Sequence, residues 1–301
     1  MVGKASALDP PTPNWAPLLW RIGPKSNPSH VIGTSHGLDS CFDSLPAVVV
    51  GALKAAHSLS LEWWDPAEKF LDSTRNRLPG GSLRALLLEH GASELLSLLE
   101  ERLNGANIGW EAIEPLKPGA VALGATTLGL KPKTRGLDVI LAERAIAASK
   151  PVRGLERSDD RSDLIDSMGV VMQLDFLANW LSAGELSQEL ASAFRAGDES
   201  ALDRALPRIP PETPAEVKRF FAITVTGRNQ LLAERIFAAL GDGRRHLFAI
   251  GAMHVVGPDS VVSQLTARGV SVKRVDVSSS VTRKTSASRP SAPRVRRAPK
   301  G

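Results

Sequence analysis

Apolar residues form two runs of strand length, one near each end of the chain, and each run leads into a Gly-x-x-His sequence. The first element covers residues 31–36, VIGTSH, and the second covers residues 248–254, FAIGAMH. A loop and an Asp-Ser pair, which favours the start of a helix, follow both histidines. Ligands of open α/β sheets bind beyond the carboxyl ends of strands, so the pattern predicts that His36 and His254 share one sheet edge.

The other apolar runs predict a sheet whose strands come mainly from the two ends of the chain. A run at 18–22, followed by a turn-rich stretch, predicts a hairpin with the first Gly-x-x-His strand. If the strand at 58–64 is parallel to that strand, a right-handed crossover brings Glu62 to the same edge as His36. The remaining predictions are strands at 151–156 and 270–277, and helices at 45–57, 135–150 and 215–240.

The middle of the chain has a helical pattern, interrupted by Gly and Pro, over residues 66–130 and 162–206. Five large apolar residues in the second segment recur at every fourth position: Leu164, Met168, Met172, Phe176 and Trp180. This spacing predicts that all five face a core. The fold class predicted is therefore α/β, a single domain with a central mixed sheet built from both chain ends, helices around it and a helical middle region. The middle helices would cover the edge of the sheet or form a lid.

Composition excludes several classes of protein. A hydrophobic content of 43% is sufficient for a sizeable core, and no run of eighteen apolar residues predicts a transmembrane helix. The N-terminal residues lack the apolar region of a secretory signal, so a cytoplasmic location is expected. The single cysteine, Cys41, excludes an internal disulfide and a cysteine-rich zinc site.

Charge is distributed unevenly along the chain. Residues 278–301 hold seven Lys and Arg and no acidic residue, so subtracting seven from the net charge of +5 leaves −2 for residues 1–277. The composition predicts an extended arm at 1–17, a folded domain at 18–277 and a disordered basic tail rich in Ser, Pro and Arg at 278–301. A solvated tail is the expected state, and nucleic acid would be bound only weakly, through the tail. The oligomeric state is left open.

Two imidazoles and one or two carboxylates at one sheet edge make a plausible site for a divalent metal. His36, His254 and Glu62 are the predicted ligands, because three protein ligands and an open position allow a bound water to act as nucleophile. Glu156 would be a fourth ligand or a general base. The same residues without a metal could form an acid/base pair, with a glutamate orienting a histidine.

Simpler interpretations of these residues stay open. Glu62 could be a carboxylate exposed at the end of a strand, and Glu156 a solvated residue in the charged loop that it begins. Asp138 and Arg228 lie on predicted helices, where ion pairing or surface exposure is common. The chain contains neither a Gly-x-Ser-x-Gly nucleophile motif nor a glycine-rich phosphate loop.

Taken together, these motifs resemble the TraB/GumN family, which includes the TraB/PrgY pheromone-shutdown proteins and Tiki-type metalloproteases within the wider EreA/ChaN-like superfamily. The resemblance covers residues 18–277. Its markers are VIGTSHG at 31–37, LSLEWWD at 59–65, RGLDVILAERA at 135–145, KPVRGLE at 150–156, GRNQLLAERI at 227–236 and LFAIGAMHVVGPDSVVSQLTARGVSVKRV at 247–275. The basic tail is additional to the family pattern, and the chain lacks the export signal of many GumN-type proteins.

The resemblance implies an α/β fold in which His36, His254 and the glutamate that matches Glu62 share one pocket. Gly33 and Gly251 would shape that pocket, and Glu156, Asp138 and Arg228 occupy further family-like positions. For Tiki-type members the resemblance implies peptidase activity that depends on a divalent metal, manganese or cobalt rather than zinc. The expected function is a metal-dependent hydrolase of peptides, amides or small molecules, with Glu62, Glu156 and Arg228 as catalytic residues. The alternative is a non-catalytic protein that binds a peptide or glycan and assists exopolysaccharide production.

Overall fold

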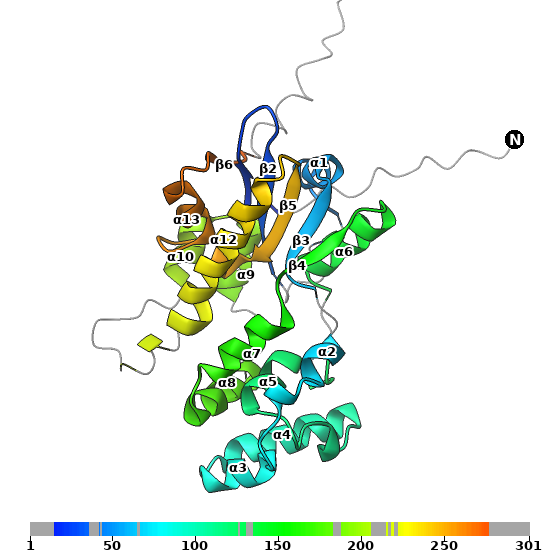
Figure 1. Cartoon of the computed structure of the whole chain (residues 1–301), viewed down its shortest axis with the longest axis vertical. Helices are drawn as coiled ribbons and strands as arrows, with labels where there is room; N and C mark the ends of the chain where they lie inside the picture. The colour runs from blue at the N-terminus through cyan, green and yellow to red at the C-terminus, as the bar shows by residue number, and fades with distance from the viewer. Residues whose placement is uncertain are drawn as a thin grey trace, which may run out of the picture.

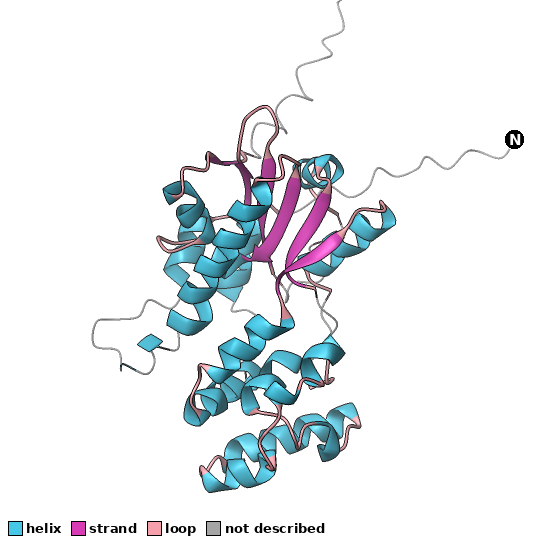
Figure 2. Cartoon of the chain, viewed as in Figure 1, coloured by secondary structure: helices cyan, strands magenta, loops and turns pink. Residues whose placement is uncertain are grey.

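A six-stranded mixed sheet forms the centre of the computed structural model (Figures 1 and 2). The strands lie in the order β4-β3-β5-β2-β1-β6, in which β2, β5, β3 and β4 are parallel and β1 is antiparallel to both β2 and β6. Their bounds are β1 Leu19–Ile22, β2 Ser29–Thr34, β3 Ser58–Trp63, β4 Val152–Glu156, β5 His246–Gly251 and β6 Val272–Arg274. The predicted α/β class and the mixed sheet built from both chain ends are confirmed.

The structure describes residues 15–35, 42, 44–64, 67–125, 127–130, 135–182, 188–205, 215, 218–219 and 222–276. His36, Cys41 and the predicted tail at 278–301 therefore lie outside the described residues. No helix within the described ranges combines the length and the apolar character needed to cross a bilayer.

The helices cover both faces of the sheet. The connections from β2 to β3 and from β3 to β4 move along the sheet in one direction, whereas those from β4 to β5 and from β5 to β6 move in the other. Because parallel crossovers are right-handed, α1 (Ala47–Ala55) and α6 (Leu137–Ala147) lie on one face. The opposite face carries α12 (Gly227–Leu240) and α13 (Val261–Ala267), which pack against each other (Figure 1).

β5 lies between β2 and β3, so the two strands that the sequence predicts as a simple crossover pair are not neighbours. Val31, Ile32, Leu59 and Phe248 of these three strands are fully buried and form the centre of the sheet core. Two further helices, α9 (Gln188–Ala196) and α10 (Glu199–Ala205), contribute buried residues to the same core. The strand β5, from the C-terminal part of the chain, is thus the central element that joins the two halves of the sheet.

A second, helical unit lies beyond the carboxyl ends of the strands (Figure 1). It has its own apolar core, which includes Phe70, Leu87, Leu99 and Leu177 and is separate from the sheet core. Its helices are α2 (Ala67–Leu71), α3 (Leu83–Glu89), α4 (Ser93–Ala106), α5 (Pro118–Gly124), α7 (Ser158–Asp166) and α8 (Val170–Ser182). The chain enters this unit after β3 and again after β4, so the helical middle region lies next to the edge where ligands of α/β sheets bind.

Two details of the predicted helices are wrong. The apolar ladder is split, because α7 ends at Asp166 and α8 begins at Val170, which changes the direction of the side chains. The buried stripe of α8 consists of Leu174, Leu177 and Leu181, while Trp180 is 38% exposed. The helix predicted at 215–240 has a π-helical turn at Ala222–Thr226 before α12. Such wide turns occur often at functional sites, and this one directly precedes Arg228.

Candidate functional site

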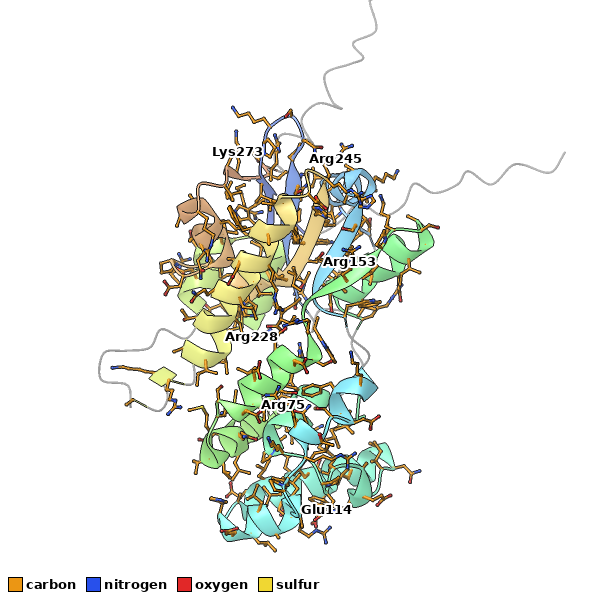
Figure 3. The ribbon with its side chains drawn as sticks, viewed as in Figure 1. Arg75, Glu114, Arg153, Arg228, Arg245 and Lys273 are labelled. Carbon is orange, nitrogen blue, oxygen red and sulfur yellow. The ribbon has the colours of Figure 1, made fainter. Side chains whose placement is uncertain are left out.

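Four of the predicted site residues meet at the carboxyl edge of the sheet. Glu62 and Glu156 lie at the ends of the neighbouring strands β3 and β4, where Trp63 pairs with Glu156. His254 ends a 3₁₀ turn, Ala252–His254, that follows β5 directly. Arg228 stands in the first turn of α12 and points to the space between the sheet and the helical unit (Figure 3). Chain segments that are far apart in sequence therefore supply one cluster of charged side chains.

Arg228 joins the two glutamates. Its Nε lies 2.6 Å from Glu156 Oε1 and its Nη2 lies 3.0 Å from Glu156 Oε2, which is the bidentate arrangement that guanidinium groups favour with carboxylates. The same Nη2 also donates to Glu62 Oε1. Nη1 forms no hydrogen bond with any described residue, and the Arg228 side chain is 21% exposed. The guanidinium thus has donors that remain available to a ligand.

The cluster is largely removed from water. The Glu156 side chain is 3% exposed and that of Glu62 is 14% exposed, so neither is the solvated surface carboxylate of the simpler interpretation. Burial alone lowers the pKa of Arg228, but the adjacent charges of Glu62 and Glu156 outweigh it and raise that pKa above its ordinary value. Arg228 is therefore a permanent cation, and the ion-pair interpretation of this residue is confirmed, although its surroundings are buried rather than exposed.

The second oxygen of Glu62 faces the Gly-x-x-His element of β5. Oε2 accepts a hydrogen bond of 2.9 Å from the backbone N–H of Gly251 and lies 3.8 Å from His254 Nε2. A Cβ atom at position 251 would lie 3.1 Å from the same oxygen and 3.5 Å from the His254 ring. Gly251 therefore allows the backbone to approach the carboxylate closely, which is the role expected of a glycine that shapes a site.

Asn229 fixes the orientation and the tautomer of the His254 ring. The Asn229 Nδ2 group donates to the carbonyl of Asp259 over 3.0 Å, so its Oδ1 faces His254 Nδ1 at 2.6 Å. An amide oxygen can only accept, and therefore Nδ1 carries a proton, so that in the neutral ring Nε2 is the nitrogen with the lone pair. Both side chains are buried, at 3% exposed for Asn229 and 6% for His254. The hydrogen-bond network thus holds the ring with its Nε2 directed towards Glu62.

This arrangement fits part of a metal site. Two ligands that each lie about 2.1 Å from one ion can be no more than about 4.2 Å apart, and the Nε2–Oε2 separation of 3.8 Å satisfies that limit. A histidine that donates Nδ1–H to an oxygen acceptor is also the usual arrangement of a metal ligand. The described residues alone contain no group of three potential ligands. A third ligand would have to come from the undescribed part of the chain, to which His36 belongs.

β2 ends at Thr34, and the described segment that contains it ends at Ser35, one residue before His36. Thr34 pairs with Gly251, and the carbonyl of Ser35 accepts a hydrogen bond of 3.1 Å from the N–H of Leu137. The same backbone contact brings the half-buried Asp138, in the first turn of α6, to this end of β2. The chain segment that leads to His36 thus reaches the edge that holds Glu62 and His254, while a shared position of the two histidines stays a prediction.

The two Gly-x-x-His elements are not equivalent in space. Thr34, rather than Gly33, pairs with Gly251, and Gly33 lies within β2. A Cβ atom at position 33 would lie 2.8 Å from Val255 Cγ2 and 3.1 Å from Leu18 Cβ. Gly33 therefore permits close packing of β2 on its neighbours, and neither glycine has a positive φ angle.

Replacing Gly33 by alanine is expected to lower the free energy of unfolding by about 1–3 kcal/mol, since the added methyl group overpacks this contact. Urea denaturation followed by circular dichroism would measure the change. Gly51→Ala is a suitable control, because Gly51 lies in α1 and a methyl group there would have no atom within 4 Å. That substitution should gain up to about 1 kcal/mol of helix propensity. Equal stability of the Gly33→Ala protein and the wild type would contradict the packing role.

Asn229 is the functional candidate that sequence reasoning misses. It follows Arg228 directly in the GRNQ segment, and a polar residue on a helix carries no signal of the buried contact that it makes. Only the packing of α12 against the loop at Asp259 places the Asn229 amide between a backbone carbonyl and the His254 ring.

Comparison with known protein families gives one match, to a family model described as the TraB/PrgY/gumN family, over residues 18–274. This range contains both Gly-x-x-His elements and every other residue of the candidate site. Comparisons with curated proteins and with solved structures gave no match.

Proposed function

Because the chain belongs to the TraB/PrgY/gumN family, we propose that it is a hydrolase that depends on a divalent metal, with a peptide or another amide as substrate. One observation carries the proposal. His254, whose Nδ1 donates to Asn229, directs its Nε2 towards Glu62 Oε2 at a separation that a single ion can bridge. His254 and Glu62 would hold the ion, and His36 is the predicted third ligand.

Manganese or cobalt is the ion proposed, on the basis of the family resemblance, and a bound divalent ion would supply a water molecule of lowered pKa. The chain itself supplies the positioning. Asn229 holds the His254 ring in place, and the Gly251 N–H fixes Glu62. Both oxygens of Glu156 bond to Arg228, so Glu156 orients the guanidinium rather than acting as a general base.

Arg228 is the residue best placed to contact a substrate. Glu62 and Glu156 hold its guanidinium plane through Nε and Nη2, whereas the N–H groups of Nη1 have no partner among the described residues. Fixed donors of this kind stabilise negative charge that develops on a carbonyl oxygen during hydrolysis. We assign Arg228 this role at the oxygen of the scissile amide.

Two exposed apolar side chains next to the cluster support a peptide substrate. Trp64 follows the Glu62-Trp63 pair at the end of β3 and is 40% exposed, and Met253 precedes His254 and is 42% exposed. Binding sites for organic ligands commonly combine apolar walls with a few polar groups. Trp64 and Met253 would contact the apolar side chains of a peptide whose backbone carbonyl reaches Arg228.

The proposal is tested by removing bound metal with a chelator and adding manganese, cobalt, iron or zinc back to the wild type and to His254→Ala. We expect a metal to raise the melting temperature of the wild type alone, because only a folded site with all its ligands binds it. Turnover would then be screened with a peptide library in the presence of that metal. If wild type and variant respond equally while both are folded, the metal proposal fails.

A non-catalytic binding protein is the second candidate, and the charge state of the cluster favours it. Arg228 already neutralises one oxygen of Glu62 and both oxygens of Glu156, so the carboxylates are paired without a metal. Such a protein would bind its peptide or glycan through Nη1 of Arg228, with no stoichiometric metal and no turnover. The chelation experiment and the library screen separate the two candidates.

A further inference from the structure

The amino edge of the sheet, opposite the candidate site, is rich in basic residues. Five chain connections meet there, at 23–28, 55–58, 147–151, 241–245 and 267–271. Hydrogen bonds link them in a row, from Gly23 N to the carbonyl of Ser271, from Asn27 Nδ2 to that of Gly243, and from His57 N to that of Arg245. The Lys150 ammonium extends the row through the carbonyl of Ala56. These connections therefore form one edge rather than separate loops.

Several basic side chains on this edge form no ion pair with a described carboxylate, whereas some basic residues elsewhere in the molecule are paired. Arg75, Lys117 and Arg235 each form an ion pair with an aspartate. By contrast, no ion pair with a described carboxylate is formed by five basic residues at or near the amino edge: Arg21, Lys25, Lys54, Arg245 and Lys273. Arg245 and Lys273 lie together at this end of the molecule (Figure 3).

The acidic content of the edge is minimal. Asp242 is the one acidic residue in the five connections, and its Oδ1 accepts hydrogen bonds from His246 Nε2 and from the Arg244 N–H. Both contacts lower the pKa of Asp242, and the hydrogen bond with His246 has the larger effect. The carboxylate therefore stays ionised and is the single negative charge that these connections set against their cations.

Like charges also face each other directly across neighbouring strands. Arg21 of β1 pairs with Lys273 of β6 on one side and with His30 of β2 on the other. Burial and the charge of Arg21 lower the pKa of His30, so that ring tends to stay neutral. Opposed like charges destabilise a sheet, and the Arg21–Lys273 repulsion would be relieved by an anion placed over the two strands.

Two exposed apolar side chains flank the basic edge. Ile146 lies in the last turn of α6 and is 55% exposed, and Phe237 lies near the end of α12 and is 48% exposed. Both helices run towards the amino edge, because each one leads into a parallel strand, but they lie on opposite faces of the sheet. Separated in this way, the two side chains cannot sandwich a nucleic-acid base, whereas both can enter a planar interface.

We propose that the amino edge of the sheet binds the surface of an anionic lipid bilayer, with its basic side chains over the headgroups and with Ile146 and Phe237 inserted at the level of the acyl boundary. Basic residues and exposed apolar side chains together are the usual means by which proteins bind such surfaces. Strands of five to six residues, at about 3.3 Å per residue, separate this edge from the candidate site. The site would therefore face away from the bilayer and stay open.

The test is flotation of the full chain with vesicles of phosphatidylcholine containing about 30 mol % phosphatidylserine, a composition that gives a negative surface potential. We expect binding to these vesicles and not to phosphatidylcholine alone. The double variant Arg245→Ala/Lys273→Ala should bind about 25-fold more weakly, since each cation near an anionic surface contributes about fivefold. Phe237→Ser should weaken the binding that persists at high salt.

The matched control is Lys69→Ala/Arg77→Ala, which removes the same charge from exposed positions in the helical unit and leaves the basic tail unchanged. The proposal is supported if this control still binds vesicles while Arg245→Ala/Lys273→Ala does not. Equal weakening of both variants would overturn it in favour of non-specific charge. The proposal would be overturned in favour of a nucleic acid if the wild type bound duplex DNA but not vesicles, and if Arg245→Ala/Lys273→Ala lost that DNA binding.

Discussion

Replacing Arg228 by methionine is expected to lower the free energy of unfolding by about 3–5 kcal/mol at neutral pH. The substitution removes the cation from between Glu62 and Glu156 while keeping most of the side-chain volume, and it leaves two mostly buried carboxylates without their shared partner. Removing one partner of a buried ion pair costs this amount because the charge of the other partner stays desolvated. Chemical denaturation of the two proteins would measure the difference.

The pH dependence of the Arg228→Met protein tests the cause. Without the guanidinium, the folded protein favours the neutral form of the buried carboxyl groups, so it binds more protons than the unfolded chain does. Stability should then recover as the pH falls towards about 4, where glutamate carboxyls in an unfolded chain also begin to bind protons. Adding Glu62→Gln and Glu156→Gln to the variant should restore much of the loss at neutral pH.

Arg75 offers a matched control for this experiment. It also bridges two carboxylates, Asp163 at 2.6 Å and Asp166 at 2.7 Å, but all three side chains are well exposed. Arg75→Met should therefore cost much less, because water and salt screen such pairs. Similar losses in the two variants would contradict a special role for burial at Arg228.

Replacing His254 by alanine is expected to lower turnover of a cleaved peptide by about 10²–10⁴-fold, the range found when a group that activates or transfers a proton is removed. Nε2 of His254 faces Glu62, so in the proposed site its loss removes both a proposed metal ligand and a potential base. The variant is expected to stay folded, since the strand β5 that precedes it is unchanged. The ratio of kcat/KM for the two proteins measures the effect.

His246 and Asn229 complete this series. His246 lies at the opposite end of the same strand, where it bonds to Ser58 and Asp242, so His246→Gln should alter stability but not turnover. Asn229→Leu removes the acceptor that fixes the His254 ring and should lower metal affinity by about 10–100-fold. If His246→Gln lowered turnover as much as His254→Ala, the effect would reflect loss of structure and not of chemistry.

The residues that the sequence could place in the candidate site are those at the ends of strands. Glu62, Glu156 and His254 each follow an apolar run of strand length, and parallel strands bring such positions to one edge. The sequence could not show that Arg228 bridges the two glutamates, because its position on α12 is set by packing across the sheet. Asn229 was unpredictable for the same reason, and β5 was not predicted to separate β2 from β3.

The failure of the predicted apolar ladder has a local cause. Residues at every fourth position share a face only if one helix is continuous, and the chain leaves the helical path between Asp166 and Val170. The leucines of α8 then form the buried face, while Trp180 is partly exposed. Nor could periodicity show that the middle helices form a core of their own, since it identifies a buried face but not the surface against which that face packs.

The central position of β5 has a consequence for the synthesis of the protein. β2 pairs with β5 across more than two hundred residues of chain, with His30 opposite Leu247, so the sheet has contacts of very high sequence separation. A nascent chain that holds β1 to β4 still lacks the strand that joins its halves, and it must keep apolar strand surfaces covered until β5 leaves the ribosome. The same event brings His254 to Glu62. A translation product that stops before β5 and His254 therefore cannot hold the assembled site.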